Sequence, residues 1–287
     1  MRVLLIGTGL IGASVGLALK SLEDFSGEVL GWDANAEELA TALRLRAIDR
    51  ALSSREAVVE PGIADVIVLA TPVLPILDWM ERLAPVLGEG QLITDVGSTK
   101  LEIVRRARRL FNQPGRARFL PGHPMAGKES GGAALAEAGL FRGAAWLFTP
   151  VDEQSSELER EWRGWVERIG ARAMDLEAER HDEVCAWVSH LPQMVATALA
   201  ALLEETFAGD AEKRAAAEAI GGRALKEMTR LGASPYSMWR DVALTNTEAI
   251  AGTLAALEQR LQHVRENLRT PELREEFRAA NRFREKR

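Results

Sequence analysis

The strongest constraint on the fold is the alternation of short apolar runs with helical patterns over the first 176 residues. The run 66–70 is apolar at every position, which is typical of a strand covered on both faces. Strands of this kind that alternate with helices indicate βαβ units and a parallel sheet. The expected strands are residues 2–6, 28–32, 65–70, 91–95, 118–120, 145–149 and 171–176, and the expected helices are 10–22, 36–46, 75–87, 100–111 and 155–169.

The strand pattern stops after residue 176. Residues 177–287 are rich in Ala, Leu, Glu and Arg with helical spacing, broken at Pro192, Gly221, Gly222 and Pro271. We therefore expect an α/β domain with a Rossmann-type, doubly wound parallel sheet over residues 1–176, followed by an all-α domain over 177–287. The charged stretch 274–287 is expected to be a solvated helix or a frayed tail.

Composition excludes several classes of protein. Of 287 residues 47% are hydrophobic, and 42 acidic against 36 basic side chains give a net charge of −6, which offers no electrostatic reason to bind nucleic acid or an anionic membrane. No apolar run approaches the roughly 20 residues of a membrane span. Cys185, the only cysteine, excludes an intramolecular disulfide and a multi-cysteine zinc site, and we expect it to be a buried, inert thiol. These features predict a cytoplasmic protein without a metal site.

A glycine fingerprint follows the first strand and opens the first helix. Gly7, Gly9 and Gly12 suit a tight turn, close approach of the backbone to a pyrophosphate, and close helix–strand packing. The backbone N–H groups at the helix start, including those of Leu10 and Ile11, can face the phosphates. The alternative is a glycine-rich strand–turn–helix that binds no nucleotide.

The ends of the next two strands strengthen the cofactor prediction. Asp33 ends the second strand about 20 residues beyond the fingerprint, where a carboxylate binds the adenosine ribose hydroxyls and repels a 2′-phosphate. Thr71 and Pro72 follow the third strand and should line the same crevice. The sequence therefore predicts NAD, in preference to NADP, as the cofactor.

Two later strand ends carry polar sequences suited to chemistry. Ser98 lies in the sequence Thr-Asp-Val-Gly-Ser-Thr-Lys, where Ser98 or Thr99 could cap the next helix, face a substrate, or do both. His123 lies among glycines and prolines just after a strand, a setting that core packing explains poorly. Imidazole can accept a proton from a hydroxyl as hydride leaves the same carbon, so we predict that His123 is a catalytic base.

The other histidines carry weaker signals. His181 begins a charged helix and His263 lies among charged residues, so both are expected to face solvent. His190 precedes Pro192, where irregular backbone could form a substrate wall, but a surface or hydrogen-bonded histidine fits the spacing equally well. Arg240, beside Asp241 at a helix–loop–helix corner, either clamps a substrate carboxylate or forms a surface ion pair.

Six segments occur together in a specific order: GTGLIG, the strand end at Asp33, DVGSTK, GHPMAGKESGG, SHLPQ and the TR…SP…MWRD segment. In this respect the chain, from residue 1 to at least Ile250, resembles the prephenate dehydrogenases, also called cyclohexadienyl dehydrogenases. The resemblance implies NAD-dependent oxidative decarboxylation of prephenate to 4-hydroxyphenylpyruvate in tyrosine biosynthesis.

The resemblance also implies residue roles. His123 matches the histidine that accepts the hydrogen bond and proton of the ring hydroxyl, Ser98 a serine that holds that hydroxyl, and Arg240 an arginine that binds a substrate carboxylate. The helical domain matches a dimerisation domain that completes the active site, which implies a homodimer. The two domains occupy all 287 residues and leave no room for a regulatory or chorismate mutase domain.

One position departs from much of the family. Many members that prefer prephenate have a second histidine where this chain has Gln193, so arogenate is an alternative substrate. His190 and Gln193 are expected to line the site for the substrate side chain. Lys128, in the glycine-rich loop after His123, could supply a second cation for a dianionic substrate.

Two rival functions make different predictions. A 3-hydroxyacid dehydrogenase would need a helical lysine with an asparagine four residues later, but Lys226 is followed at that spacing by Arg230. A non-catalytic NAD-binding sensor would not require His123, Ser98 and Arg240 to meet in one cleft.

Overall fold

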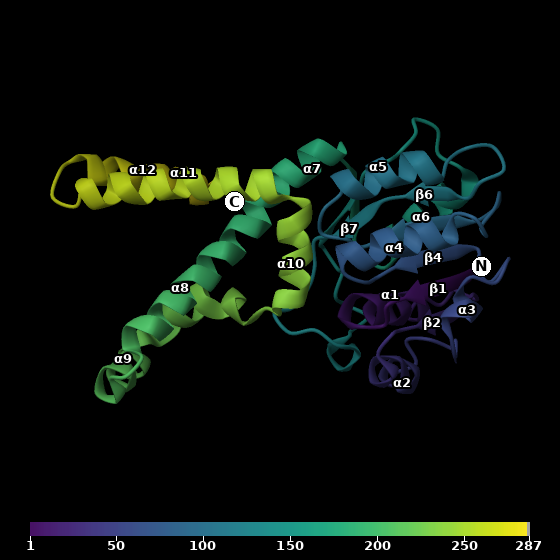
Figure 1. Ribbon diagram of the computed structural model, residues 1–287, viewed down its shortest axis with the longest axis horizontal. Helices are drawn as coiled ribbons and strands as arrows, with labels where there is room; N and C mark the ends of the chain where they lie inside the picture. Colours follow the sequence, from purple (N-terminus) through teal and green to yellow (C-terminus); the bar gives the residue numbers. More distant parts are fainter. Residues whose placement is uncertain (286–287) are drawn as a thin grey trace.

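The computed structural model describes residues 1–285 and has two parts, a sheet domain and a pair of long helical arms (Figure 1). The sheet domain is built on a six-stranded parallel sheet in the order β3-β2-β1-β4-β5-β6. This order reverses direction between β1 and β4, as in a Rossmann fold, so the predicted fold class is confirmed. The strands are β1 (Arg2–Ile6), β2 (Glu28–Trp32), β3 (Arg50–Ala51), β4 (Val66–Leu69), β5 (Leu92–Asp95) and β6 (Arg118–Leu120).

Helices cover both faces of this sheet because its strands are apolar on both sides. On β1, Leu4 and Ile6 pack into one core and Val3 and Leu5 into the other, as the two-residue period of a strand requires. The first core contains residues of α4 and α5, and the second contains residues of α1 and α6. The helices of this domain are α1 (Leu10–Lys20), α2 (Ala36–Arg44), α3 (Arg55–Val58), α4 (Val73–Leu83), α5 (Leu101–Leu110) and α6 (Glu157–Arg168).

A second, three-stranded sheet was not expected from the sequence. It contains β7 (Gly122–Pro124), β8 (Ala145–Phe148) and β9 (Arg172–Asp175), with β7 antiparallel to β8 and β8 parallel to β9. The prediction that β8 and β9 extend the parallel sheet is therefore wrong, although both are strands. Only Pro121 separates β6 from β7, which is far shorter than the crossover that a parallel neighbour needs.

The rest of the described chain is helical. Its elements are α7 (Ala178–Cys185), a π-helical turn (Ala186–His190), α8 (Leu191–Phe207), α9 (Ala211–Thr229), a 3-10 turn (Arg230–Ala233), α10 (Tyr236–Thr245), α11 (Thr247–Glu266) and α12 (Glu272–Glu285). Pro192 does not end the helix, because the π-helical turn before it carries the chain through. The predicted charged helix corresponds to α12, and residues 286–287 of that prediction lie outside the described residues.

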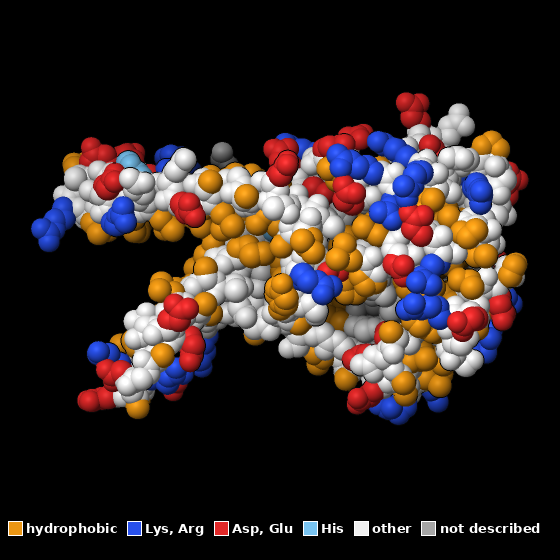
Figure 2. Space-filling model, in the orientation of Figure 1, with side chains coloured by type: hydrophobic (Ala, Val, Ile, Leu, Met, Phe, Trp, Pro, Cys, Tyr) orange, Lys and Arg blue, Asp and Glu red, His pale blue; other side chains and the backbone are white. Residues whose placement is uncertain are grey.

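The helical part forms two arms that point away from the sheet domain, while α10 lies across their base (Figure 1). One arm contains α8 and α9, and the other contains α11 and α12. Hydrophobic side chains gather at the base of the gap and along the edge of the α11–α12 arm that faces it (Figure 2). Large exposed apolar residues on the arms are Leu202, Ile220, Met228, Leu261, Leu268 and Phe277.

The helix that starts the first arm corrects one expectation. Among residues 1–285, the continuous helix Ala178–Phe207 is long and apolar enough to pass a length-and-composition test for a membrane span. The expectation from the sequence that no apolar run approaches the length of a membrane span is therefore wrong. The test alone is weak evidence for a membrane, because helices of soluble proteins also pass it.

Candidate active site

The glycine loop lies where the strand order of the sheet reverses. Gly7 has a φ of +95°, and a Cβ there would lie 2.4 Å from the Ala70 carbonyl oxygen at the end of β4. A Cβ at Gly12 would lie 2.0 Å from the Gly7 carbonyl oxygen. At Gly9, by contrast, a Cβ would meet no atom of residues 1–285 within 4 Å. Two glycines thus allow close packing, and the third leaves open space at the start of α1.

That open space suits a dinucleotide phosphate. Gly9 caps α1, and within the described chain no side chain caps this helix and no acidic residue lies in its first turn. The backbone N–H groups that begin the helix, including those of Leu10 and Ile11, therefore provide an anion site of the kind that binds pyrophosphate.

The predicted ribose-binding carboxylate lies beside the loop. Asp33 Oδ2 accepts hydrogen bonds from the Thr8 backbone N–H at 2.6 Å and from the Thr8 hydroxyl at 3.3 Å. Thr8 was not singled out from the sequence, because its position between glycines gave no signal of this contact. Thr71 borders Gly7 across the crevice and Pro72 starts α4. The predicted cofactor residues thus gather at one edge of the sheet.

His123 lies on β7 and makes a hydrogen bond to a second histidine. Its side chain is almost entirely buried, and Nδ1 lies 2.9 Å from Nε2 of His181. His181 is completely buried, so the prediction that it faces solvent is wrong. The charged neighbours of His181 misled that prediction, because α7 packs its His181 face against α5 of the sheet domain.

Asp182 holds this histidine and also caps a helix of the sheet domain. Its Oδ1 lies 2.8 Å from His181 Nδ1, and its carboxylate accepts the backbone N–H groups of Lys100 at 2.7 Å and Leu101 at 2.9 Å. The cap of α5 therefore comes from α7, and the reading of Ser98 or Thr99 as that cap is wrong. The Thr99 hydroxyl instead contacts the Thr245 hydroxyl at 2.7 Å.

These contacts determine which ring nitrogens carry protons. A carboxylate that accepts two backbone N–H groups can only accept at His181, so His181 Nδ1 carries a hydrogen and donates it to Asp182. In a neutral imidazole Nε2 is then the acceptor, and it receives the hydrogen of His123 Nδ1. The chain from Asp182 through His181 consequently leaves Nε2 of His123 without a proton, as a base requires.

Burial favours the neutral form of all three histidines in this region. It lowers the pKa of His123 well below the usual range, assisted by the positive charge of Lys100 and by the neighbouring histidines. Burial also lowers the pKa of His181, although the hydrogen bond to Asp182 opposes this. It lowers the pKa of His190 to about 4. His123 is therefore available as a proton acceptor at neutral pH.

His190 and Ser98 lie next to this chain. His190 is buried in the π-helical turn, and its Nδ1 lies 3.2 Å from the Asn246 amide nitrogen, which also donates to the Asp182 carbonyl oxygen at 2.9 Å. The backbone of Ser98 faces the His190 ring. Ser98 itself is half-buried in the turn after β5. Ser98 therefore lies beside His190, and Asn246 contacts both His190 and the backbone of Asp182.

Arg240 lies at the junction of the two domains. Its Nε and Nη2 donate to Asp241 Oδ1 at 2.9 and 2.8 Å, while Asp241 Oδ2 accepts the Leu74 backbone N–H at 3.0 Å. Asp241 is completely buried, whereas the Arg240 side chain is 48% exposed. This pair is therefore more than a surface ion pair, because it fixes a half-exposed guanidinium beside the start of α4.

Gln193 and Lys128 are engaged with the protein itself. Buried Gln193 donates to the Leu231 carbonyl oxygen at 2.7 Å and accepts from the Ser234 hydroxyl at 3.2 Å, so it fastens the turn before α10. Lys128 donates to the Leu135 carbonyl oxygen at 2.8 Å and pairs with Glu137 at 3.3 Å. A substrate would reach either group only in competition with these partners.

The ligand atoms of His123, His181 and Cys185 lie within 4.8 Å of one another. Burial raises the pKa of the Cys185 thiol to about 12, and the two histidines already share a hydrogen bond. The expectation of a buried, inert thiol is confirmed. We therefore interpret the cluster of His123, His181 and Cys185 as the surroundings of a positioned proton, in preference to a metal site.

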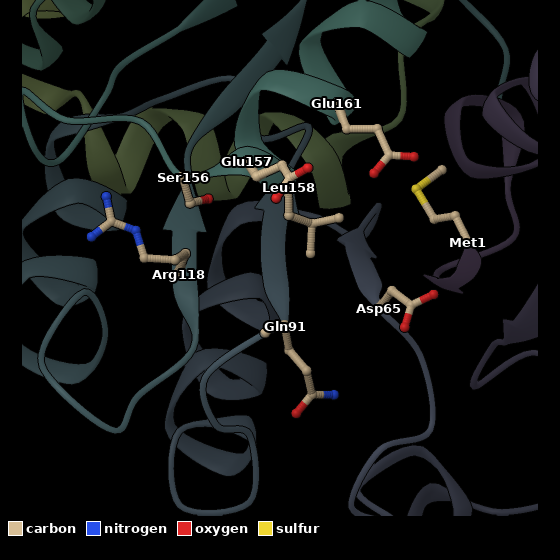
Figure 3. Close-up of a pocket in the computed structure, with 9 residues that line it drawn as sticks. Met1, Asp65, Gln91, Arg118, Ser156, Glu157, Leu158 and Glu161 are labelled. Carbon is tan, nitrogen blue, oxygen red and sulfur yellow. The ribbon is translucent and has the colours of Figure 1, made fainter.

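A surface pocket lies at the other edge of the parallel sheet (Figure 3). Met1, Asp65, Gln91 and Arg118, which line it, lie at the amino ends of four strands. Cofactors of doubly wound sheets bind outside the carboxyl ends, so this pocket is separate from the candidate active site.

A glycine loop at the strand-order reversal, a buried pair of hydrogen-bonded histidines and a helical second domain define a two-domain, dinucleotide-binding oxidoreductase. The nucleotide-binding domain of prephenate dehydrogenases matches residues 15–175, and the dimerization domain of the same enzymes matches residues 177–281. The chain belongs to the prephenate dehydrogenase family, as the resemblance of its motifs predicted.

Individual relatives agree with this assignment. A prephenate dehydrogenase of Bacillus subtilis is 36% identical over 86% of this chain, and one of Lactococcus lactis is 34% identical over 92%. The matches span 65% and 70% of those two proteins, so the chain covers about two thirds of their length. The structure of an Aquifex aeolicus prephenate dehydrogenase with hydroxyphenyl propionate and NAD+ is 28% identical, with a TM-score of 0.82 and coverage of 100% of this chain and 95% of that one.

Proposed function

We propose that the protein catalyses the NAD-dependent oxidative decarboxylation of prephenate to 4-hydroxyphenylpyruvate, a step of tyrosine biosynthesis in the cytoplasm. The observation that carries the proposal is the buried chain from Asp182 through His181 to His123, which leaves a bare imidazole nitrogen in this family of nucleotide-binding enzymes. The Aquifex aeolicus relative, whose bound molecules are NAD+ and a hydroxyphenyl compound, supports the cofactor and the substrate class.

The residues present fit NAD. Gly7, Gly9 and Gly12 shape the loop, the N–H groups of Leu10 and Ile11 begin the uncapped helix, and Asp33 lies beside them, with Thr71 and Pro72 across the crevice. When bound there, NAD accepts the hydride that leaves the hydroxyl-bearing ring carbon.

His123 handles the proton of this reaction. As hydride leaves the ring carbon, Nε2 of His123 accepts the proton of the attached hydroxyl. The bond to the ring carboxylate breaks, CO₂ leaves, and its electron pair completes the aromatic ring. The proton then returns to the oxygen as a phenol, so no net proton is released. In our proposal Ser98, beside His190, holds the same hydroxyl.

The substrate carries two carboxylates and therefore needs local positive charge. Arg240 supplies it from the domain junction, with its guanidinium oriented by Asp241. In our proposal Lys128 adds a second cation, and His190 and Gln193 form the wall beside the substrate side chain. The net charge of −6 means that this attraction has to come from the site, because the surface as a whole does not provide it.

Arogenate dehydrogenase or dual-specificity activity is the second candidate. Gln193 is a neutral amide, and an arogenate dehydrogenase of Synechocystis superimposes with a TM-score of 0.76 at 27% identity over 100% of this chain and 99% of that one. Parallel assays of prephenate and arogenate, each with NAD and NADP, decide between them. Turnover with neither substrate would refute both proposals.

The variant His123→Asn tests the mechanism. It keeps a polar side chain but no base, so we expect turnover to fall about 1,000-fold with NAD binding nearly unchanged. His263→Asn is the matched control, because His263 is half-exposed on α11 and should retain full activity. Retained activity in His123→Asn would remove this residue from the mechanism.

We also propose that the domains divide between residues 176 and 177 and that the protein is a homodimer assembled through the helical domain. The exposed apolar residues of the two arms support this, as does the match to a dimerization domain. We expect Ile220→Glu to yield monomers in light scattering, whereas Leu43→Glu, on exposed α2, should not. A monomeric wild-type protein would refute the proposal.

A further inference from the structure

The interior of the sheet domain contains an ion pair directly behind the candidate active site. Asp95 ends β5, and its carboxylate pairs with the ammonium group of Lys100. Both side chains are completely buried. Lysine and aspartate are almost never fully buried unless they are paired, and such a pair is weak evidence for stability alone. The groups that the pair contacts therefore indicate its role.

The Asp95 carboxylate binds the backbone immediately before each of the two candidate catalytic residues. Its Oδ2 accepts the N–H of Gly97 at 2.8 Å, and its Oδ1 accepts the N–H of Gly122 at 3.2 Å. Gly97 precedes Ser98, and Gly122 precedes His123. One side chain therefore ties the turn after β5 to strand β7.

The two glycines are required by this close approach. A Cβ at Gly97 would lie 2.9 Å from Asp95 Oδ2, and a Cβ at Gly122 would lie 2.9 Å from the Asp95 carbonyl oxygen. Both distances are shorter than real Cβ contacts. A side chain at position 97 would push the turn away from the Asp95 carboxylate, and one at position 122 would push β7 away from the end of β5. The two glycines therefore belong to the same arrangement as Asp95.

Lys100 favours the charged form of Asp95. Burial raises the pKa of Asp95, while the Lys100 ammonium and the two glycine N–H groups act in the opposite direction. The same ammonium lowers the pKa of His123 and of His181. The backbone of Lys100 is in turn held by Asp182, so the ion pair and the histidine chain share one anchor.

We propose that Asp95 is the positioning residue that holds Ser98 and His123 in fixed positions relative to each other, with Lys100 as its buried counter-ion. The inference rests on the proposed function, because that function is the reason to align Ser98 with His123. The hydrogen bonds themselves can be tested without substrate. Asp95 touches neither substrate nor cofactor in this scheme, and it acts through the backbone of Gly97 and Gly122.

The test compares Asp95→Asn with a matched control, Asp49→Asn. Asp49 lies in the same domain, pairs with Lys20 and accepts the Val29 backbone N–H at 2.8 Å, but lies outside the catalytic loops. An amide at position 95 has only one oxygen, so one of the two glycine N–H groups loses its acceptor. We expect the kcat of Asp95→Asn to fall about 100-fold, as a loop displacement of roughly 1 Å would cause. NAD affinity should change less than about threefold, and Asp49→Asn should keep the wild-type kcat.

Amide hydrogen exchange provides the readout that needs no substrate. In Asp95→Asn the N–H group of Gly97 or of Gly122, whichever loses its acceptor, should exchange faster than in the wild type, and in Asp49→Asn neither should. If Asp95→Asn shows this faster exchange but the wild type turns over neither prephenate nor arogenate, the positioning role is supported and the proposed function is refuted. A folded Asp95→Asn with the exchange pattern and kcat of the Asp49→Asn control would overturn the positioning role.

Two further variants keep the test decisive if Asp95→Asn does not fold. Gly97→Ala places a Cβ against Asp95 Oδ2 and should reproduce both the loss of kcat and the faster exchange. Lys100→Met removes the buried counter-ion of Asp95, so it should also lower kcat and speed the exchange of these N–H groups. Either variant with the kcat and the exchange pattern of the wild type would contradict the proposal.

Discussion

Nδ1 of His123 lies 2.9 Å from Nε2 of His181, and this hydrogen bond joins the sheet domain to the first helix of the helical part. The orientation of the base is therefore decided by a residue on the other side of the domain junction. Asp182 contacts the His181 ring and also caps α5, so the contacts that join the two domains are the same ones that orient His123, the proposed base.

Loss of His181 should weaken catalysis without removing the base. In His181→Leu the ring of His123 has no acceptor for its Nδ1 hydrogen, so ring orientation and tautomer are no longer fixed. We expect kcat to fall about 100-fold with substrate KM changed much less. Steady-state kinetics beside the His263→Leu control measure this, and an unchanged kcat would exclude a positioning role for His181.

The pH dependence of activity follows from burial of His123. Its lowered pKa keeps the imidazole neutral at pH values below the usual histidine range, near 6.5. We expect kcat/KM to stay level from neutral pH to below 6.5 and to fall only in more acidic solution. A pH series of kcat/KM tests this, and an acid limb at or above pH 6.5 would contradict it.

Acid should also destabilise the fold through His190. Its pKa is about 4 in the folded protein against about 6.5 for an ordinary, exposed histidine, so between these pH values the unfolded chain binds more protons. The stability that His190 contributes is complete above about pH 6.5 and is lost as the pH falls toward 4, by up to about 3 kcal/mol. Urea unfolding of His190→Asn should show a flatter pH dependence than the wild type. Identical slopes would refute this assignment.

Cofactor preference should depend on Asp33. Removing the carboxylate in Asp33→Ala deletes the group that repels a 2′-phosphate and its hydrogen bonds to Thr8. We expect the ratio of kcat/KM for NAD over NADP to fall at least about tenfold. Asp78→Ala, on the exposed face of α4, is the control. Unchanged selectivity in Asp33→Ala would mean that another group reads the ribose.

Substrate affinity should depend on Arg240. A hydrogen bond to a charged group contributes about 1.5–3 kcal/mol, so Arg240→Ala should raise the substrate KM roughly 10- to 100-fold. NAD affinity should stay the same, and Arg240→Lys should restore only part of the loss because it cannot pair bidentately with Asp241. Arg260→Ala, in an exposed pair on α11, is the control. An unchanged KM in Arg240→Ala would exclude the clamp.

Local sequence was sufficient for the cofactor half of the molecule. The period of apolar residues revealed β1, β2, β4, β5 and β6. The spacing from Gly12 to Asp33 predicted that the glycine loop and this carboxylate meet at one edge of the sheet. These features follow from backbone sterics and strand periodicity, which act over a few residues. The strand β7 that presents His123 was missed, because its residues Gly122, His123 and Pro124 include two types that are depleted in strands.

The sequence by itself determined that the chain has a Rossmann-type domain, a helical second part and a histidine, His123, in a segment rich in glycine and proline. Only the tertiary structure decided how that histidine is prepared. His181 lies 58 residues from His123 and Asp182 lies 82 residues from Lys100, so no local pattern relates them. Packing of α7 on α5 buries these polar groups together, and buried donors and acceptors must then satisfy one another, which gives His123 its partner and its tautomer.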